Sequence, residues 1–102
     1  MKALSVSQVG QWLEEHPAPV HLGQQESWAG RVTRELGQAT LPELARLLAD
    51  GDPELQYQAM AAARCLGAEV WAETVDPELC WSVRLPGESS PRFIRPKNQV
   101  TL

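Results

Sequence analysis

The chain has 102 residues, of which 43% are hydrophobic and 22% are charged, and its formal net charge is −4. These values are ordinary for a soluble globular protein, and the length suits a single domain, residues 1–102. The first residues lack the apolar run of a signal peptide, and no stretch could span a bilayer, so we expect no membrane partner. Cys65 and Cys80 make no disulfide framework and are expected to be reduced thiols in a bacterial-type cytoplasm.

Charge is distributed unevenly along the chain. Residues 1–83 hold 12 acidic against 5 basic side chains, whereas residues 84–102 hold Arg84, Arg92, Arg95 and Lys97 against Glu88. We expect an acidic helical body over 1–83 and a basic, partly extended tail over 84–102. The tail is either solvated or docks on an acidic partner, on nucleic acid or on its own body.

The first two expected elements are helices. Residues 6–15 follow Ser5, which together with Gln8 has the spacing of a capping box. Pro17 and Pro19 end this helix, because proline disfavours helical backbone in the residue before it. A second helix is expected from about Gln24 to Leu36, with Trp28 and Val32 on its apolar side.

The strongest helical pattern covers Thr40 to Gly67. Thr40 and Glu43 predict a capping box for a third helix, which Gly51 would end in a left-handed conformation. Asp52 is the expected N-cap of a fourth helix, with Pro53 in its first turn. The short connection predicts that these two helices are antiparallel neighbours.

This helix pair resembles a HEAT-like repeat unit of the short bacterial type. The family motif Asp-x-x-Val-Arg-x-x-Ala-x-x-Ala-Leu-x-x-Leu-Gly is matched at Asp52, Leu55, Ala59, Ala62, Leu66 and Gly67, and it departs at Gln56. Residues 5–37 resemble a degenerate copy of this unit. Five positions 30 residues apart correspond between the two segments: Ala29, Val32, Arg34, Leu36 and Gly37 in the first, and Ala59, Ala62, Arg64, Leu66 and Gly67 in the second. The resemblance implies a mainly α fold of two stacked antiparallel helical hairpins, followed by an extended or β-hairpin C-terminal segment.

The segment after Gly67 has two interpretations. Residues 68–75 fit a short helix with Val70, Trp71 and Thr74 facing inward, and the Asp-Pro-Glu-Leu sequence at 76–79 repeats the start of the fourth helix. Residues 80–86 alternate as a strand instead, with Trp81, Val83 and Leu85 on one face. We expect one helical turn and then an extended segment. Residues 91–96 could return as a second strand.

Residue spacing predicts no catalytic, metal or cofactor site. The cysteines and histidines lack zinc-ligand spacing, and the chain has no phosphate-binding glycine loop. Cys80 with His16 or His21 is the one Cys–His pair that could act as a nucleophile, and nothing in the spacing favours it. Cys65 lies beside the buried side of its helix, where a packed thiol is expected. We therefore expect a non-enzymatic protein.

The predicted function is protein–protein interaction, as an adaptor, chaperone or inhibitor-like module whose partner is another protein or a second copy. In HEAT-like proteins the second helices line the binding surface, so the resemblance implies a site on the outer face of the fourth helix, with Tyr57, Met60 and Arg64. Trp71 and Trp81 are further candidate anchors. The open alternative is that Tyr57 and Met60 pack under the N-terminal helix or the C-terminal segment, and that Trp71 and Trp81 cover the end of the helical stack.

A second prediction is a nucleic-acid-binding accessory protein. Arg92, Phe93, Arg95 and Lys97 place basic residues around an aromatic ring, a combination that can contact phosphates and bases. The acidic body would oppose such binding, and four cations reach only a few phosphates.

Overall fold

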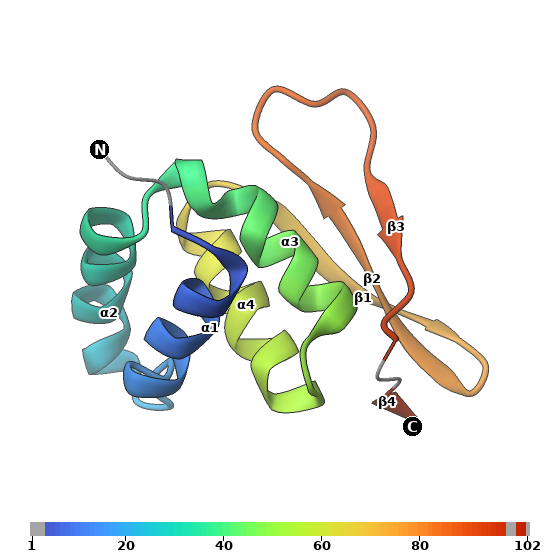
Figure 1. Cartoon of the computed structure of the whole chain (residues 1–102), viewed down its shortest axis with the longest axis horizontal. Coiled ribbons are helices and arrows are strands. Elements are labelled where there is room, and N and C mark those ends of the chain that lie inside the picture. Colours follow the sequence, from blue (N-terminus) through green and yellow to red (C-terminus); the bar gives the residue numbers. More distant parts are fainter. Residues whose placement is uncertain (1–3, 98–99, 102) are drawn as a thin grey trace.

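The computed structural model describes residues 4–97 and 100–101. Within that range the helices come first along the chain and the strands last (Figure 1). The helices are α1 (Val6–Glu15), α2 (Leu22–Glu35), a 3-10 turn (Gln38–Thr40), α3 (Leu41–Asp50) and α4 (Pro53–Cys65). The strands are β1 (Glu69–Val75), β2 (Glu78–Arg84), β3 (Arg92–Ile94) and β4 (Val100–Thr101).

This α+β arrangement contradicts the expected mainly α fold of two stacked helical hairpins, and the helical body ends well before residue 83. Residues 69–75 form a strand in place of the expected helical turn, and β1 pairs antiparallel with β2 from Glu69↔Arg84 to Val75↔Glu78. Valine, threonine and tryptophan, which dominate β1, lose side-chain freedom in a helix and pack well on a pleated surface. Because β2 provides hydrogen-bond partners along its whole length, residues 69–75 are more stable as a strand than as a helix.

The Asp-Pro-Glu-Leu sequence shows how strongly context decides. At 52–55 it begins α4, where Asp52 accepts a hydrogen bond from the Leu55 backbone N–H at 2.8 Å. At 76–79 it makes the turn between β1 and β2, with a cis peptide bond at Asp76–Pro77. The predicted helix start at Asp76 is therefore wrong.

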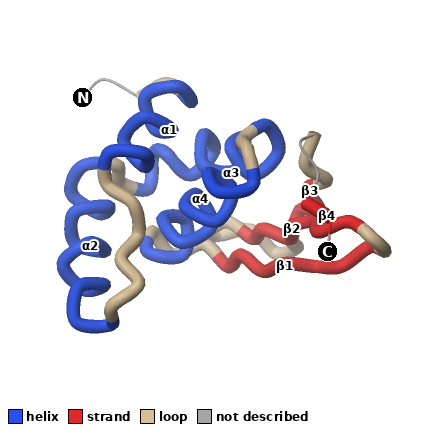
Figure 2. The backbone as a smooth tube through the Cα atoms, turned by 90° about the horizontal axis from the view of Figure 1, so that it is seen from below, coloured by secondary structure: helices blue, strands red, loops and turns tan. Residues whose placement is uncertain are grey.

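The four helices form a bundle beside the sheet (Figure 2). The predicted α3–α4 pair is confirmed as closely packed neighbours, α1 packs on both of these helices, and α2 packs on α4. One core joins the helices to the sheet, and among its members are Val9, Leu13, Val32, Leu44, Leu48, Ala59, Ala62, Val70 and Trp81. Small alanines on α4 allow the close approach of its neighbours.

The helix ends follow the sequence only in part. The Ser5–Gln8 capping box is confirmed, since each side chain accepts from the other residue's backbone N–H. The Thr40–Glu43 box does not form, because Thr40 ends the 3-10 turn and its hydroxyl donates to the Gly37 carbonyl. Gly51 is extended, with φ −76°, so the left-handed stop predicted there is also wrong.

β2 is the central strand of the sheet. β1 lies on one side of it, and β3 and β4 share the other side, through pairs such as Trp81↔Ile94 and Leu79↔Val100. The β1–β2 hairpin projects beyond the helices (Figure 1). The expected second strand around residues 91–96 is confirmed as β3.

Candidate functional site

Side chains along β2 point alternately to the two faces of the sheet. Leu79, Trp81 and Val83 belong to the core shared with the helices. Cys80 and Ser82 therefore point to the opposite side, since successive side chains in a strand face opposite ways. Helices cover only the first of these sides among the described residues (Figures 1 and 2).

An aromatic row crosses the uncovered side. Trp71 on β1 and Phe93 on β3 lie opposite Ser82 on β2, one on each side of it. We call this surface the outer face and define it by Trp71, Val75, Cys80, Ser82 and Phe93. Phe93 is 51% and Val75 40% exposed, and Trp71 is half-buried.

Ser82 and Cys80 are buried although they point away from the helices. Neighbouring side chains on the same face must therefore cover them, and large aromatic rings on the adjacent strands are placed to do so. The outer face thus carries Trp71 and Phe93 on either side of Ser82, with Val75 further along β1. Glu73, which pairs with Cys80, lies between Trp71 and Val75 on the same face.

Polar groups lie beside and between these apolar side chains. The Trp71 indole N–H donates to Oε1 of Glu73 at 3.1 Å. Nε of Arg84 donates to Glu69 at 2.8 Å, and Nη1 of Arg95 lies 3.7 Å from Glu78. The Arg84 guanidinium, through its hydrogen bonds, holds the pKa of the Glu69 carboxyl below its ordinary range. An apolar centre with a polar rim is the usual composition of a protein interface.

Every cation of the predicted nucleic-acid site has a carboxylate partner within the chain. Arg92 bonds to Glu88 and lowers the pKa of that carboxyl, Arg95 pairs with Glu78, and Lys97 lies 3.1 Å from Asp50. The cationic side chain of each pair is exposed, and such ion pairs are individually weak. They nevertheless cancel most of the positive charge that the tail would present to phosphates. Phe93 lies among them on the outer face.

The side of α4 that was predicted to bind a partner makes contacts within the protein instead. Met60 and Arg64 line a cleft of about 260 Å³ between α4, α2 and the Ala18–Pro19 linker. The Arg64 guanidinium donates to the Val70 carbonyl of β1 from Nε at 2.8 Å and from Nη2 at 2.5 Å. Tyr57 is 45% exposed and packs edge-on against Trp81, with ring centroids 5.4 Å apart.

Trp81 is fully buried and presents no surface to a partner. Its indole N–H donates to Oε1 of the equally buried Gln56 at 3.0 Å, which ties β2 to α4. The candidate anchor Trp81 is therefore a core residue. Of the five residues predicted to bind a partner, Trp71 is the one that lies on the outer face, and Tyr57, Met60 and Arg64 lie on the helical side.

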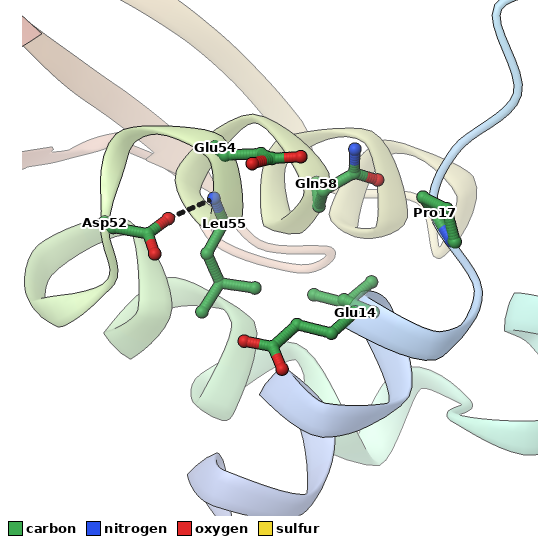
Figure 3. A pocket seen from close by; sticks show the side chains of 7 residues that line it. Glu14, Pro17, Asp52, Glu54, Leu55 and Gln58 are labelled. Carbon is green, nitrogen blue, oxygen red and sulfur yellow. Dashed lines mark hydrogen bonds between the residues drawn. The ribbon is translucent and has the colours of Figure 1, made fainter.

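An acidic cleft of about 280 Å³ lies between α1 and the first turns of α4 (Figure 3). Glu14 extends from α1 below Leu55, while Asp52 and Glu54 belong to the start of α4 (Figure 3). Asp52 already serves as the N-cap through its bond to the Leu55 N–H. The cleft combines three carboxylates with Leu13 and Leu55, and none of its lining residues is a serine, threonine, cysteine, lysine or histidine.

The cysteines and histidines are distributed over separate parts of the fold. Cys80 is buried on β2, whereas the ring of His16 stacks on Trp12 at the end of α1, with centroids 4.6 Å apart. Cys65 is exposed at the end of α4, so the expectation of a packed thiol there is wrong. Partial desolvation raises the pKa of the Cys65 thiol, which disfavours the reactive thiolate.

No family model, no curated protein and no solved structure matches the chain. The HEAT-like resemblance of residues 40–67 therefore stays a prediction. Over the described residues, none of the helices has the length and apolar character needed to cross a membrane. The sequence predicted only some of the residues of the outer face as functional. Trp71 and Phe93 were candidates for different functions, and Val75 was missed, although the alternation of Trp71, Glu73 and Val75 was the available signal.

Proposed function

We propose that the protein is a non-enzymatic protein–protein interaction module that binds its partner through the outer face of the sheet. The observation that carries this proposal is the aromatic row of Trp71 and Phe93 around Ser82, on a side that no described helix covers. The site replaces the outer face of α4, whose Met60 and Arg64 are engaged within the protein. Phe93 brings the C-terminal segment into the proposed site.

The composition of the outer face fits a protein partner. Tryptophan and other large apolar residues near the centre of a patch are the side chains that contribute most to binding. Val75 and Phe93 each leave 40% or more of their surface exposed, which a partner can bury. The best partner surface is an apolar side chain flanked by a hydrogen-bond donor, which would meet Glu73. The free cysteines fit a reducing compartment such as the cytoplasm.

Paired valine substitutions test this site. Purified protein carrying Val75→Ser is compared with Val20→Ser in capture from a lysate of the source organism. Val20 is 87% exposed but lies in the linker before α2, so it controls for the loss of a surface valine. We expect Phe93→Ser to weaken capture about tenfold, as loss of an anchoring aromatic residue does, and Val75→Ser to weaken it more than Val20→Ser does. Equal capture by all the variants would refute the proposal.

Nucleic-acid binding is the second candidate, because Phe93 and Trp71 could stack on bases on the same open sheet. The paired state of Arg92, Arg95 and Lys97 favours the protein partner. Fluorescence polarisation with a labelled single-stranded oligonucleotide separates the two. Binding that falls steeply with added salt and is lost in Phe93→Ser would support nucleic acid. We expect no such binding.

A further inference from the structure

The outer edge of β1 carries backbone groups that have no partner strand in the described part of the chain. β1 pairs with β2 on one side only. The Val70 carbonyl accepts hydrogen bonds from Arg64 and so points away from β2. Residues in an antiparallel strand alternate between pairs that exchange hydrogen bonds and pairs that do not. The N–H and C=O groups of Ala72 and Thr74 therefore also point away from β2.

The helices leave this stretch open. Ala72 and Thr74 share the face of Val70, yet both are exposed, whereas Val70 is buried under the helices. The hairpin carrying them projects past the helical layer (Figure 1). An exposed row of unpaired strand groups is a template for another strand. Arg64 protects only the end of the edge nearest to α4.

We propose that the free edge of β1 pairs antiparallel with β1 of a second copy, about a twofold axis at Ala72. In this register Trp71 lies opposite Glu73 of the second copy, and Glu69 lies opposite Val75, so no like charges face each other. The register centred one residue later places Glu73 opposite Glu73, which is destabilising. The register centred one residue earlier places Glu69 opposite Glu73, so avoidance of facing like charges favours the Ala72 register over both of its neighbours. The pairing uses the edge and does not depend on the function proposed for the outer face.

Arg64 limits the strength of this pairing. In the Ala72 register the Thr74 N–H of one copy meets the Val70 carbonyl of the other. That carbonyl already accepts two N–H groups from Arg64, which occupy both of its lone pairs. Removal of the guanidinium frees the carbonyl for the second copy. Arg64 thus determines whether the Val70 carbonyl can take part in pairing with the second copy.

The test is the monomer–dimer equilibrium measured by analytical ultracentrifugation over a dilution series. Ala72→Pro removes a free N–H without removing a bond to β2, and we expect it to be monomeric where the natural protein is dimeric. Ala72→Thr is the control, since it keeps the N–H and should still dimerise. Arg64→Ala should lower the dissociation constant by about tenfold, because each restored hydrogen bond adds a modest net stabilisation. Arg46→Ala, with the same loss of charge on α3, should leave the constant unchanged.

Hydrogen exchange of the unsubstituted protein provides a test that needs no variant. The amides of Ala72 and Thr74 should exchange quickly when dilute and slow down as dimer forms. A chain that stays monomeric to roughly 1 mM would overturn the proposal, since weaker pairing is beyond the range of specific association. So would a dimer that survives Ala72→Pro but is lost in Phe93→Ser, because the copies would then meet through their outer faces.

Discussion

The indole Nε1 of Trp81 donates to Oε1 of Gln56 at 3.0 Å, and both side chains are fully buried. The amide nitrogen of Gln56 in turn donates to the Gly51 carbonyl at 2.8 Å. One glutamine therefore joins the central strand, α4 and the connection between α3 and α4. A buried polar group that loses its partner costs more than the hydrogen bond contributed.

Substitution of this glutamine should destabilise the whole fold. Gln56→Leu leaves the Trp81 N–H and the Gly51 carbonyl without their partner, at a cost of about 2 kcal/mol. For a chain of this size the melting temperature should fall by about 10 °C, measured by calorimetry. Gln11→Leu, at an exposed position on α1, is the control. If Trp81→Phe added to Gln56→Leu lowered stability by the full sum of the single effects, the two side chains would not be coupled.

Two glycines should respond in opposite directions to alanine. Gly67 has φ +95°, a conformation that side chains disfavour, so Gly67→Ala should destabilise by about 1–2 kcal/mol. Gly23 lies in α2 with open space around it, and Gly23→Ala should stabilise by about 0.5–1 kcal/mol. Urea unfolding of both variants gives the comparison. Loss of stability in Gly23→Ala would contradict the assignment of that residue to α2.

Acid should destabilise the protein through two carboxylates that accept hydrogen bonds from arginines. Hydrogen bonds from Arg84 and Arg92 lower the pKa of Glu69 and Glu88 in the folded state, respectively. Their stabilisation is complete above the ordinary glutamate pKa of about 4.3 and is lost as the pH falls through the lower folded values. The melting temperature should therefore drop less between pH 5 and about pH 3 in Glu69→Gln and Glu88→Gln. Glu26→Gln, on α2, serves as control, and an equal drop in every protein would exclude the ion pairs as the cause.

The two cysteines should differ in reactivity toward a thiol reagent. Cys65 is exposed and should be modified in the folded protein, slowly at neutral pH because its pKa is raised. Cys80 is buried and should react only when the sheet opens. Mass spectrometry after timed labelling distinguishes the two sites. Labelling of Cys80 as fast as that of Cys65 would show that the outer face is open to solvent down to β2.

The helices could be predicted because their signals are local. Periodic leucines, the Ser5–Gln8 box and the Asp52 N-cap all act within one or two turns, and the observed α1 and α4 begin where those residues place them. The predicted cap at Thr40 did not form because Thr40 ends the 3-10 turn with helical backbone, φ −88° and ψ −1°, whereas Ser5 and Asp52 are extended as an N-cap requires. The conformation that a preceding turn gives to a residue cannot be seen in the spacing of Thr40 and Glu43.

The sheet could not be predicted in full because its evidence is long-range. Residues 69–75 are too short for period alone to separate helix from strand, and the Asp-Pro turn lacks the usual Asn-Gly hairpin signal. The strand β1 exists because β2 pairs along its whole length. Trp71 was expected to face inward with Val70, but a strand sends these neighbours to opposite faces. The candidate site was missed for the same reason, since the row of Trp71, Ser82 and Phe93 requires three strands in register.

The contrast between Trp81 and Trp71 gives the molecule an optical reporter of its own. Trp81 is sealed in the core with a bonded indole, while Trp71 lies half-exposed on the opposite side of the same sheet. A dissolved quencher such as acrylamide should reach the second ring and leave the first one bright. Trp12 and Trp28 are also partly exposed, so the measurement uses a variant in which both are phenylalanine. A molecule that binds over Trp71 would then shield the one accessible indole, and its binding can be followed by emission without an attached dye.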